Sequence, residues 1–142
     1  MRALLDINVL LALLDQQHIH HRRARDWLER ERAAGWASCA ITQNGFVRII
    51  SQSGYPGPIT PKAAIDLLTA ATATAYHEFW PCSASLLDPQ AVDANRVHNH
   101  RQVTDIYLLA LAKDAGGRFA TFDQSVSLTA VPGSSAEHLV VL

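Results

Sequence analysis

Three aspartates stand where their carboxylates could share one metal ion. Asp6 follows the apolar segment 3–5, Asp123 follows the mainly apolar segment 118–122, and Asp105 stands in the first turn of an expected helix. A carboxylate at the end of an apolar run is costly to bury unless something pairs with it or binds it. Oxygen ligands with retained waters suit Mg²⁺ or Mn²⁺, and such an ion can activate water for attack on a phosphodiester. These residues therefore predict a divalent-metal site suited to phosphodiester hydrolysis.

Two of the aspartates also have a simpler explanation. Asp105 could be an ordinary acid at a helix start, and Asp123 could form a turn with Gln124 and Ser125. Asp6 is harder to explain in this way, because its apolar neighbours leave its charge without a local partner. The three positions taken together favour a shared metal site.

The elements that must position these aspartates follow from an alternation of short apolar segments with helical patterns. Strands are expected at residues 3–5, 36–39, 77–81, 118–121 and 138–141, and helices at 8–14, 20–34, 42–51, 60–73 and 104–115, with a short helix or turn from residue 85. This alternation predicts an α/β fold in which a short, mainly parallel central sheet is flanked by helices. Ligands of such sheets bind at the carboxyl ends of the strands, where Asp6 and Asp123 are expected to meet.

The length and composition limit the kinds of protein that this chain can be. A chain of 142 residues with 49% hydrophobic residues and a formal charge of −1 fits one globular domain spanning residues 1–142. The sequence shows no signal segment and no apolar run long enough to span a bilayer, so we expect no membrane association and a cytoplasmic location. Cys39 and Cys82 lack a metal-binding spacing and are expected to be reduced thiols in the core.

Four segments carry a recognisable pattern in a fixed order. They read LLDINVLLA at 4–12, WASCAITQNGFVR at 36–48, VTDIYLLALA at 103–112 and ATFD at 120–123. Together they resemble the PIN-domain ribonucleases, and in particular the VapC-type toxins of toxin–antitoxin pairs. Any one segment is weakly specific, but four in order cover nearly the whole chain. The resemblance implies a single PIN-like domain.

The same resemblance implies a function and a set of site residues. The family consists of metal-dependent endoribonucleases that use Mg²⁺ or Mn²⁺ and act as toxins of type II toxin–antitoxin systems. It implies an RNA substrate, neutralisation by a cognate VapB-type antitoxin, and a homodimer. Asp6, Asp105 and Asp123 match the acidic, metal-binding and catalytic positions of the family. Asn8 matches the small polar residue that supports the first acid, and Thr121 matches the hydroxyl residue before the last one.

The chain departs from the family at one position. Many relatives carry a further acid, usually Glu, in the helix after the second strand. Residues 32–65 contain no Asp or Glu, and Gln43 and Asn44 occupy this region instead. An amide oxygen accepts a hydrogen bond but adds no charge, so either residue could hold a metal-bound water. The departure leaves open a catalytically weakened PIN scaffold that serves as a binding module for RNA or a protein partner.

Arginine dominates the basic residues. Ten of the twelve are Arg, and five of these fall between residues 22 and 32. This segment could contact RNA phosphates or an acidic antitoxin segment, or it could form a solvated helix face paired with its own acids. Arg48 and Arg101 are expected to bind substrate phosphates, because each lies close in sequence to an element of the proposed site.

Two other α/β classes also place an acid after an early apolar strand. A haloacid-dehalogenase-type phosphatase normally needs a second Asp two residues later, where this chain has Asn8. A response-regulator receiver domain normally has paired early acids and a late Lys, whereas Lys113 lies inside an expected helix. Neither class fits the chain as well as the ribonuclease does.

Overall fold

A five-stranded parallel sheet forms the centre of the protein, whose computed structural model describes all 142 residues. The strands are β1 (Ala3–Leu5), β2 (Trp36–Ser38), β3 (His77–Phe79), β4 (Arg118–Thr121) and β5 (Leu139–Val141). They lie in the order β3-β2-β1-β4-β5, and every neighbouring pair is parallel. β1 is thus central, and its carboxyl end lies beside that of β4. The predicted parallel α/β architecture is confirmed.

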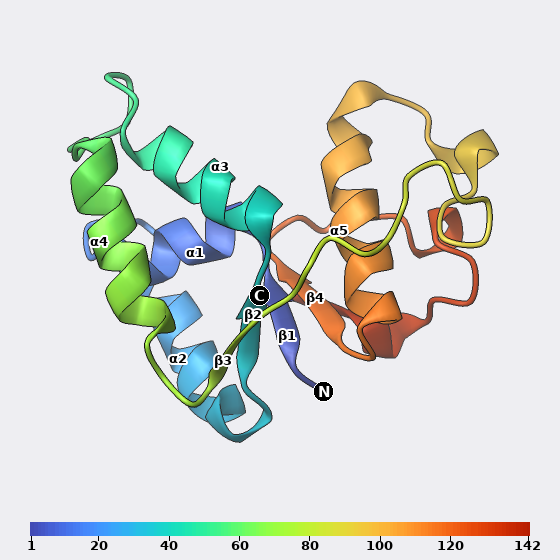
Figure 1. The fold of residues 1–142 in the computed structure, drawn as a ribbon, viewed down its shortest axis with the longest axis horizontal. Coiled ribbons are helices and arrows are strands. Elements are labelled where there is room, and N and C mark those ends of the chain that lie inside the picture. The colour runs from blue at the N-terminus through green and yellow to red at the C-terminus, as the bar shows by residue number, and fades with distance from the viewer.

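Five helices cover the two faces of this sheet. They are α1 (Ile7–Leu14), α2 (His21–Glu31), α3 (Ala40–Ile50), α4 (Pro61–Thr72) and α5 (Val103–Asp114). Helices α1 to α4 lie on one side of the strands and α5 lies on the other (Figure 1). Short 3₁₀ turns at Arg32–Ala34, Ala94–Arg96, His100–Gln102, Leu128–Ala130 and Ala136–His138 connect these elements.

The sheet separates two hydrophobic cores. Successive strand residues point to opposite faces, so Leu5 packs in a core with α1 to α4 while Leu4 packs in a core with α5. Both side chains are completely buried. The three tryptophans are buried: Trp27 and Trp36 belong to the first core and Trp80 to the second. Asp6 comes two residues after Leu4, so it faces the same side of the sheet as Leu4, the side of α5.

Local chemistry explains where the elements begin and end. Helix α4 begins as predicted, because the Thr60 hydroxyl accepts a hydrogen bond from the Ala63 amide at 3.1 Å and Pro61 opens the first turn. Helix α2 ends at Glu31, three residues before the predicted end, because the chain tightens into a 3₁₀ turn before Gly35, whose φ is +78°. Strand β3 ends at Phe79, since Pro81 has no N–H to continue the ladder.

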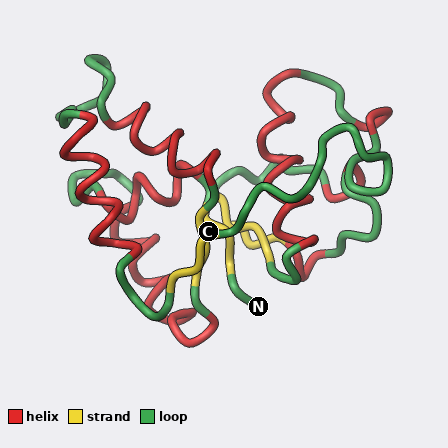
Figure 2. Tube along the Cα trace, in the orientation of Figure 1, coloured by secondary structure: helices red, strands yellow, loops and turns green.

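A long connection joins the two sides of the sheet. After β3 the chain crosses without regular structure to the side of α5 (Figure 2). The Tyr107 hydroxyl of α5 donates to the Ala84 carbonyl at 2.9 Å and ties this connection down. Both cysteines are free thiols, and Cys39 is buried just before α3 as expected. Cys82, expected in the core, is instead exposed, because it lies on this connection. No helix has the length and apolar character needed to cross a membrane.

Candidate active site

Asp6 lies directly after β1 and caps helix α1. Its Oδ1 accepts a hydrogen bond from the Ile7 amide at 2.7 Å, and its Oδ2 accepts one from the Thr121 hydroxyl at 2.7 Å. The residue is only 5% exposed. Burial raises the pKa of Asp6 above its ordinary value, while the hydrogen bonds from Thr121 and Ile7 oppose that rise. The capping position thus supplies local donors for a carboxylate that would otherwise be buried at high cost.

Thr121, the last residue of β4, connects two of the aspartates. Its side chain is completely buried. The hydroxyl donates to Asp6 and accepts a hydrogen bond from the Asp123 amide at 3.0 Å. Because β1 and β4 are adjacent parallel strands, one hydroxyl can hold both acids at the same edge of the sheet.

Asp105 and Asp123 lie in contact. Burial raises the pKa of Asp105 to about 7, helped by the negative charges of Asp6 and Asp123, and the protonated carboxyl hydrogen-bonds Asp123. Asp123 is exposed, and its Oδ1 accepts hydrogen bonds from the Ser125 amide at 2.7 Å and the Ser125 hydroxyl at 2.6 Å. These two bonds lower the pKa of Asp123. At neutral pH Asp123 therefore stays ionised, whereas Asp105 is near the midpoint of its titration.

The donor set fits a hard divalent cation. No three acidic, histidine or cysteine side chains already stand in a metal-holding arrangement, so binding requires side-chain adjustment. Mg²⁺ in proteins commonly takes one or two carboxylates and keeps several waters. Burial is the largest cause of the elevated pKa of Asp105, and the negative charges of Asp6 and Asp123 add to it; a bound cation would relieve this repulsion. Asp6, Asp105 and Asp123 are the residues that would hold it.

A hollow of about 380 Å³ adjoins the exposed side of this cluster. Asp105 and Asp123 form part of its lining, together with polar residues from the turn before α5 and from the loop after β4: Asn99, Arg101, Gln102, Ser125 and Ser127. Arg101 is exposed and forms no ion pair with any acid. The hollow thus joins two carboxylates to one free guanidinium group.

Known proteins share both the sequence and the fold. The family model for the PIN domain matches residues 3–132. Ribonuclease VapC44 of Mycobacterium tuberculosis is 62% identical over 142 residues, the full length of both chains. The chain belongs to the VapC ribonucleases of the PIN-domain family. Ribonuclease VapC39 of the same organism is 45% identical over 134 residues, 94% of this chain and 96% of that one.

A solved structure adds a comparison of the fold alone. The crystal structure of Mycobacterium tuberculosis VapC20, described as a sarcin–ricin loop cleaving toxin, superposes with a TM-score of 0.59 at 14% identity. The match covers 87% of this chain and 91% of that one. The predicted family, a VapC-type PIN-domain toxin ribonuclease with a parallel α/β fold, is confirmed.

Three residues assigned by resemblance to the VapC site do not contact its aspartates. Asn8 is exposed on α1 and forms no side-chain hydrogen bond; the Thr121 hydroxyl and the Ile7 amide support Asp6 instead. Gln43 donates to the Ser38 hydroxyl at 2.9 Å. Gln43 and Asn44 line a separate hollow of about 250 Å³ between α3 and α4. That Gln43 or Asn44 holds a metal-bound water in place of the missing acid stays a prediction.

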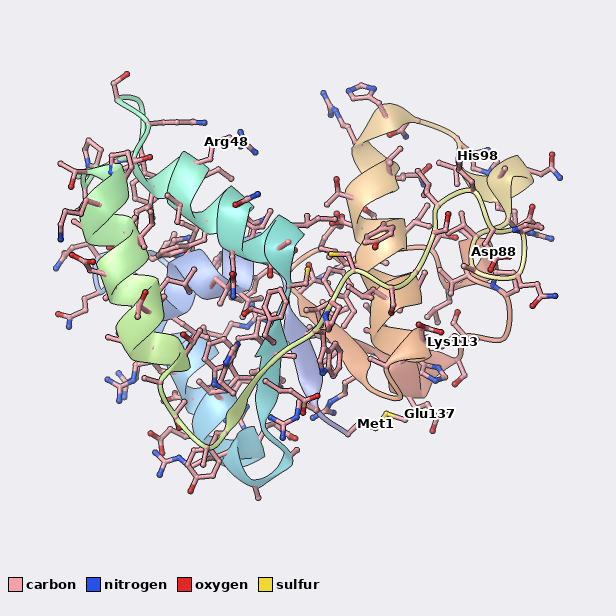
Figure 3. The ribbon with its side chains drawn as sticks, viewed as in Figure 1. Met1, Arg48, Asp88, His98, Lys113 and Glu137 are labelled. Atoms are coloured by element: carbon pink, nitrogen blue, oxygen red, sulfur yellow. The ribbon has the colours of Figure 1, made fainter.

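The two arginines predicted to bind phosphate lie at different places. Arg101 borders the hollow beside Asp105. Arg48 projects into solvent from α3, on the side of the molecule where α5 begins (Figure 3). It does not line the hollow, so any contact with RNA would lie farther along the substrate.

Sequence reasoning missed three polar residues of the site. The sequence predicts Ser125 only as a turn residue. An Asp followed two residues later by Ser is, however, the pattern of a turn in which the Asp side chain accepts from the backbone. Asn99 and Gln102 have the spacing of a capping box, a helix-start signal that here also places two amides beside the acids.

Proposed function

We propose that this VapC protein, acting as a single domain over residues 1–142, is an endoribonuclease that requires Mg²⁺ or Mn²⁺. The observation that supports it most directly is the cluster in which one buried hydroxyl, Thr121, joins Asp6 and Asp123 while Asp105 contacts Asp123. A divalent ion held by these carboxylates supplies water activation and neutralises charge that develops on the phosphate.

The protein's own residues orient the site. The Ile7 amide and the Thr121 hydroxyl fix both oxygens of Asp6. Ser125 engages Oδ1 of Asp123, which leaves Oδ2 without a Ser125 contact. Arg101, exposed at the hollow, would bind a phosphate of the RNA, and Arg48 would bind another one farther away.

The decisive test is Asp6→Asn. An asparagine keeps the shape and the helix cap but removes the negative charge, so we expect a folded protein whose RNA cleavage is abolished in saturating Mg²⁺ or Mn²⁺. Asp26→Asn is the matched control, because Asp26 is exposed on α2 and forms no hydrogen bond or ion pair through its side chain. Cleavage by Asp6→Asn at the wild-type rate would contradict the mechanism.

A second candidate function is a PIN scaffold that binds RNA or a protein without cutting. It is favoured by the absence of a ready-made three-ligand metal site and of any acid in residues 32–65. Calorimetric titration with Mn²⁺ separates the two functions. RNA binding without metal binding or cleavage would support the scaffold, whereas metal binding with cleavage supports the enzyme.

We further propose that a cognate VapB-type antitoxin covers the hollow of about 430 Å³ between α1, α2 and α4. Apolar side chains, including Leu10, Leu14 and Leu28, line it. Arg32 pairs with Glu29, which lines the same hollow, so Arg25 is the lining residue that adds unpaired positive charge. This combination suits an antitoxin segment with apolar side chains and acidic neighbours. Expression of the chain alone should arrest growth, and co-expression of the antitoxin should relieve the arrest; harmless expression would favour the binding-only function.

A homodimer and a cytoplasmic location complete the proposal. Sedimentation of the purified toxin would test the first, and fractionation of expressing cells would test the second. The homodimer rests on the resemblance to VapC-type toxins, and the cytoplasmic location rests on the sequence pattern; neither rests on a contact within the chain.

A further inference from the structure

The turn before α5 holds two side-chain amides in a fixed orientation. The Asn99 side-chain oxygen accepts a hydrogen bond from the Arg101 amide at 2.9 Å. The Gln102 side-chain oxygen accepts from the backbone amides of His98 at 2.8 Å and Asn99 at 3.2 Å. Since the oxygens are occupied, the NH₂ ends of both side chains remain as donors, and neither has a protein acceptor.

These donors belong to the hollow beside the aspartates. Asn99, Arg101 and Gln102 all line it, so the lining includes two amides with unpaired NH₂ groups and a guanidinium group. Val126, which is half-buried, is the apolar lining residue with exposed surface, since Ile106 is almost fully buried. Asp105 and Asp123 contribute acceptors elsewhere in the lining.

This distribution fits a nucleobase better than a second phosphate. The phosphate at the cut would lie at the carboxylates and Arg101, so the uncharged amides of Asn99 and Gln102 are left for a neutral base, whose flat face Val126 could contact. A free amide reads adenine through its NH₂ and its oxygen together, and here the oxygens are engaged. Guanine carries two adjacent acceptors, O6 and N7, on one edge, which matches the two unpaired NH₂ donors.

We infer that Asn99 and Gln102 form a subsite, beside the phosphate-binding Arg101, that selects guanine in a nucleotide flanking the cleaved phosphate. The inference rests on the proposed ribonuclease function and adds the base that its site prefers. Direct recognition of this kind typically discriminates between bases by about fivefold to a hundredfold.

The experiment is cleavage of a randomised RNA library by the full-length protein with Mn²⁺, followed by sequencing of the new ends. We expect guanine to be enriched at least fivefold at one position beside the cut. Asn99→Asp and Gln102→Glu keep the capping oxygens but replace each NH₂ donor with an acceptor, so both should lose this enrichment. Asn95→Asp is the matched control, because it adds the same charge at an exposed amide outside the hollow.

Base preference is a ratio, so a general slowing by added negative charge leaves it unchanged. Replacing the selected guanine with inosine, which keeps O6 and N7, should preserve cleavage, whereas 7-deazaguanine should reduce it. An even base distribution with active enzyme, enrichment of another base, or unaltered preference in Asn99→Asp and Gln102→Glu would overturn the inference while leaving the ribonuclease function intact. Uniform loss of rate in these variants without change of preference would identify a phosphate contact instead.

Discussion

Thr121→Val tests whether one hydroxyl holds the acidic cluster together. Valine has nearly the shape of threonine, so the substitution leaves the packing of β4 in place and removes only the hydroxyl. Asp6 loses one of its two hydrogen bonds and the Asp123 amide loses its acceptor. The fully buried position of Thr121 admits no water to replace them.

The expected cost follows from these two contacts. A hydrogen bond to a charged group contributes about 1.5–3 kcal/mol, and an unpaired backbone amide adds about 1 kcal/mol or more. A total of about 3 kcal/mol corresponds to a fall of about 6–12 °C in Tm for a domain of this size. The pKa of Asp6 should rise further, because the Thr121 bond is the strongest effect that lowers it. Affinity for Mn²⁺ should then fall by about tenfold or more, as happens when partners of metal ligands are removed.

The assay pairs thermal unfolding in EDTA with calorimetric titration of Mn²⁺. Thr104→Val is the control, since Thr104 is exposed on α5 and its side chain forms no hydrogen bond. A Thr121→Val protein with wild-type Tm and wild-type affinity for Mn²⁺ would refute the view that the hydroxyl organises the site.

Two further predictions concern the other carboxylates. Asp105 has a pKa of about 7 when folded against 3.8 as the reference, so the folded state binds more protons between about pH 4 and pH 7 and wild-type stability falls as pH rises through that window. In EDTA, the free energy of unfolding of Asp105→Asn, measured with urea, should match that of the wild type near pH 4 and exceed it by about 2 kcal/mol at pH 8, after allowance for partial exposure. Equal stability of the two proteins at both pH values would argue against the elevated pKa of Asp105, which burial and the charges of Asp6 and Asp123 produce. Ser125→Ala removes a 2.6 Å hydrogen bond to Asp123 and should weaken Mn²⁺ binding by about tenfold. Cleavage should be recovered at high Mn²⁺ concentration, and Ser125→Thr should restore the affinity. An unchanged affinity in Ser125→Ala would show that Ser125 is dispensable for the position of Asp123.

The fold and the aspartate cluster could be predicted because their signals are local. Short apolar segments ending in an acid mark the strands, and parallel strands bring their carboxyl ends to one edge. Asp6 and Thr121 thereby come together from positions far apart in the chain, joined by the pairing of β1 with β4. The sequence needed only to identify the strands for this contact to follow.

The surroundings of the cluster depend on helix rotation, which the sequence does not reveal. Gln43 and Asn44 lie near the right place in the chain, but α3 directs them toward α4 and Ser38. Gly45 is one of the buried residues of α3, and a methyl group there would lie 2.2 Å from the Ile7 side chain of α1. This close approach is a tertiary contact that helps to fix the rotation of α3, and no local pattern in residues 40–50 encodes it.

The hydrogen bond from the Ile7 amide to Asp6 also bears on how the protein can be produced. A toxin that halts growth is most easily prepared as an inactive variant, and alanine is the usual substitution for such a purpose. Alanine at position 6 would remove the N-cap of α1 as well as the charge, at a cost of about 1 kcal/mol from the cap alone. Asparagine keeps the capping oxygen. An Asp6→Asn protein is therefore the better reagent for antitoxin binding and crystallography, because its surface should remain that of the native toxin.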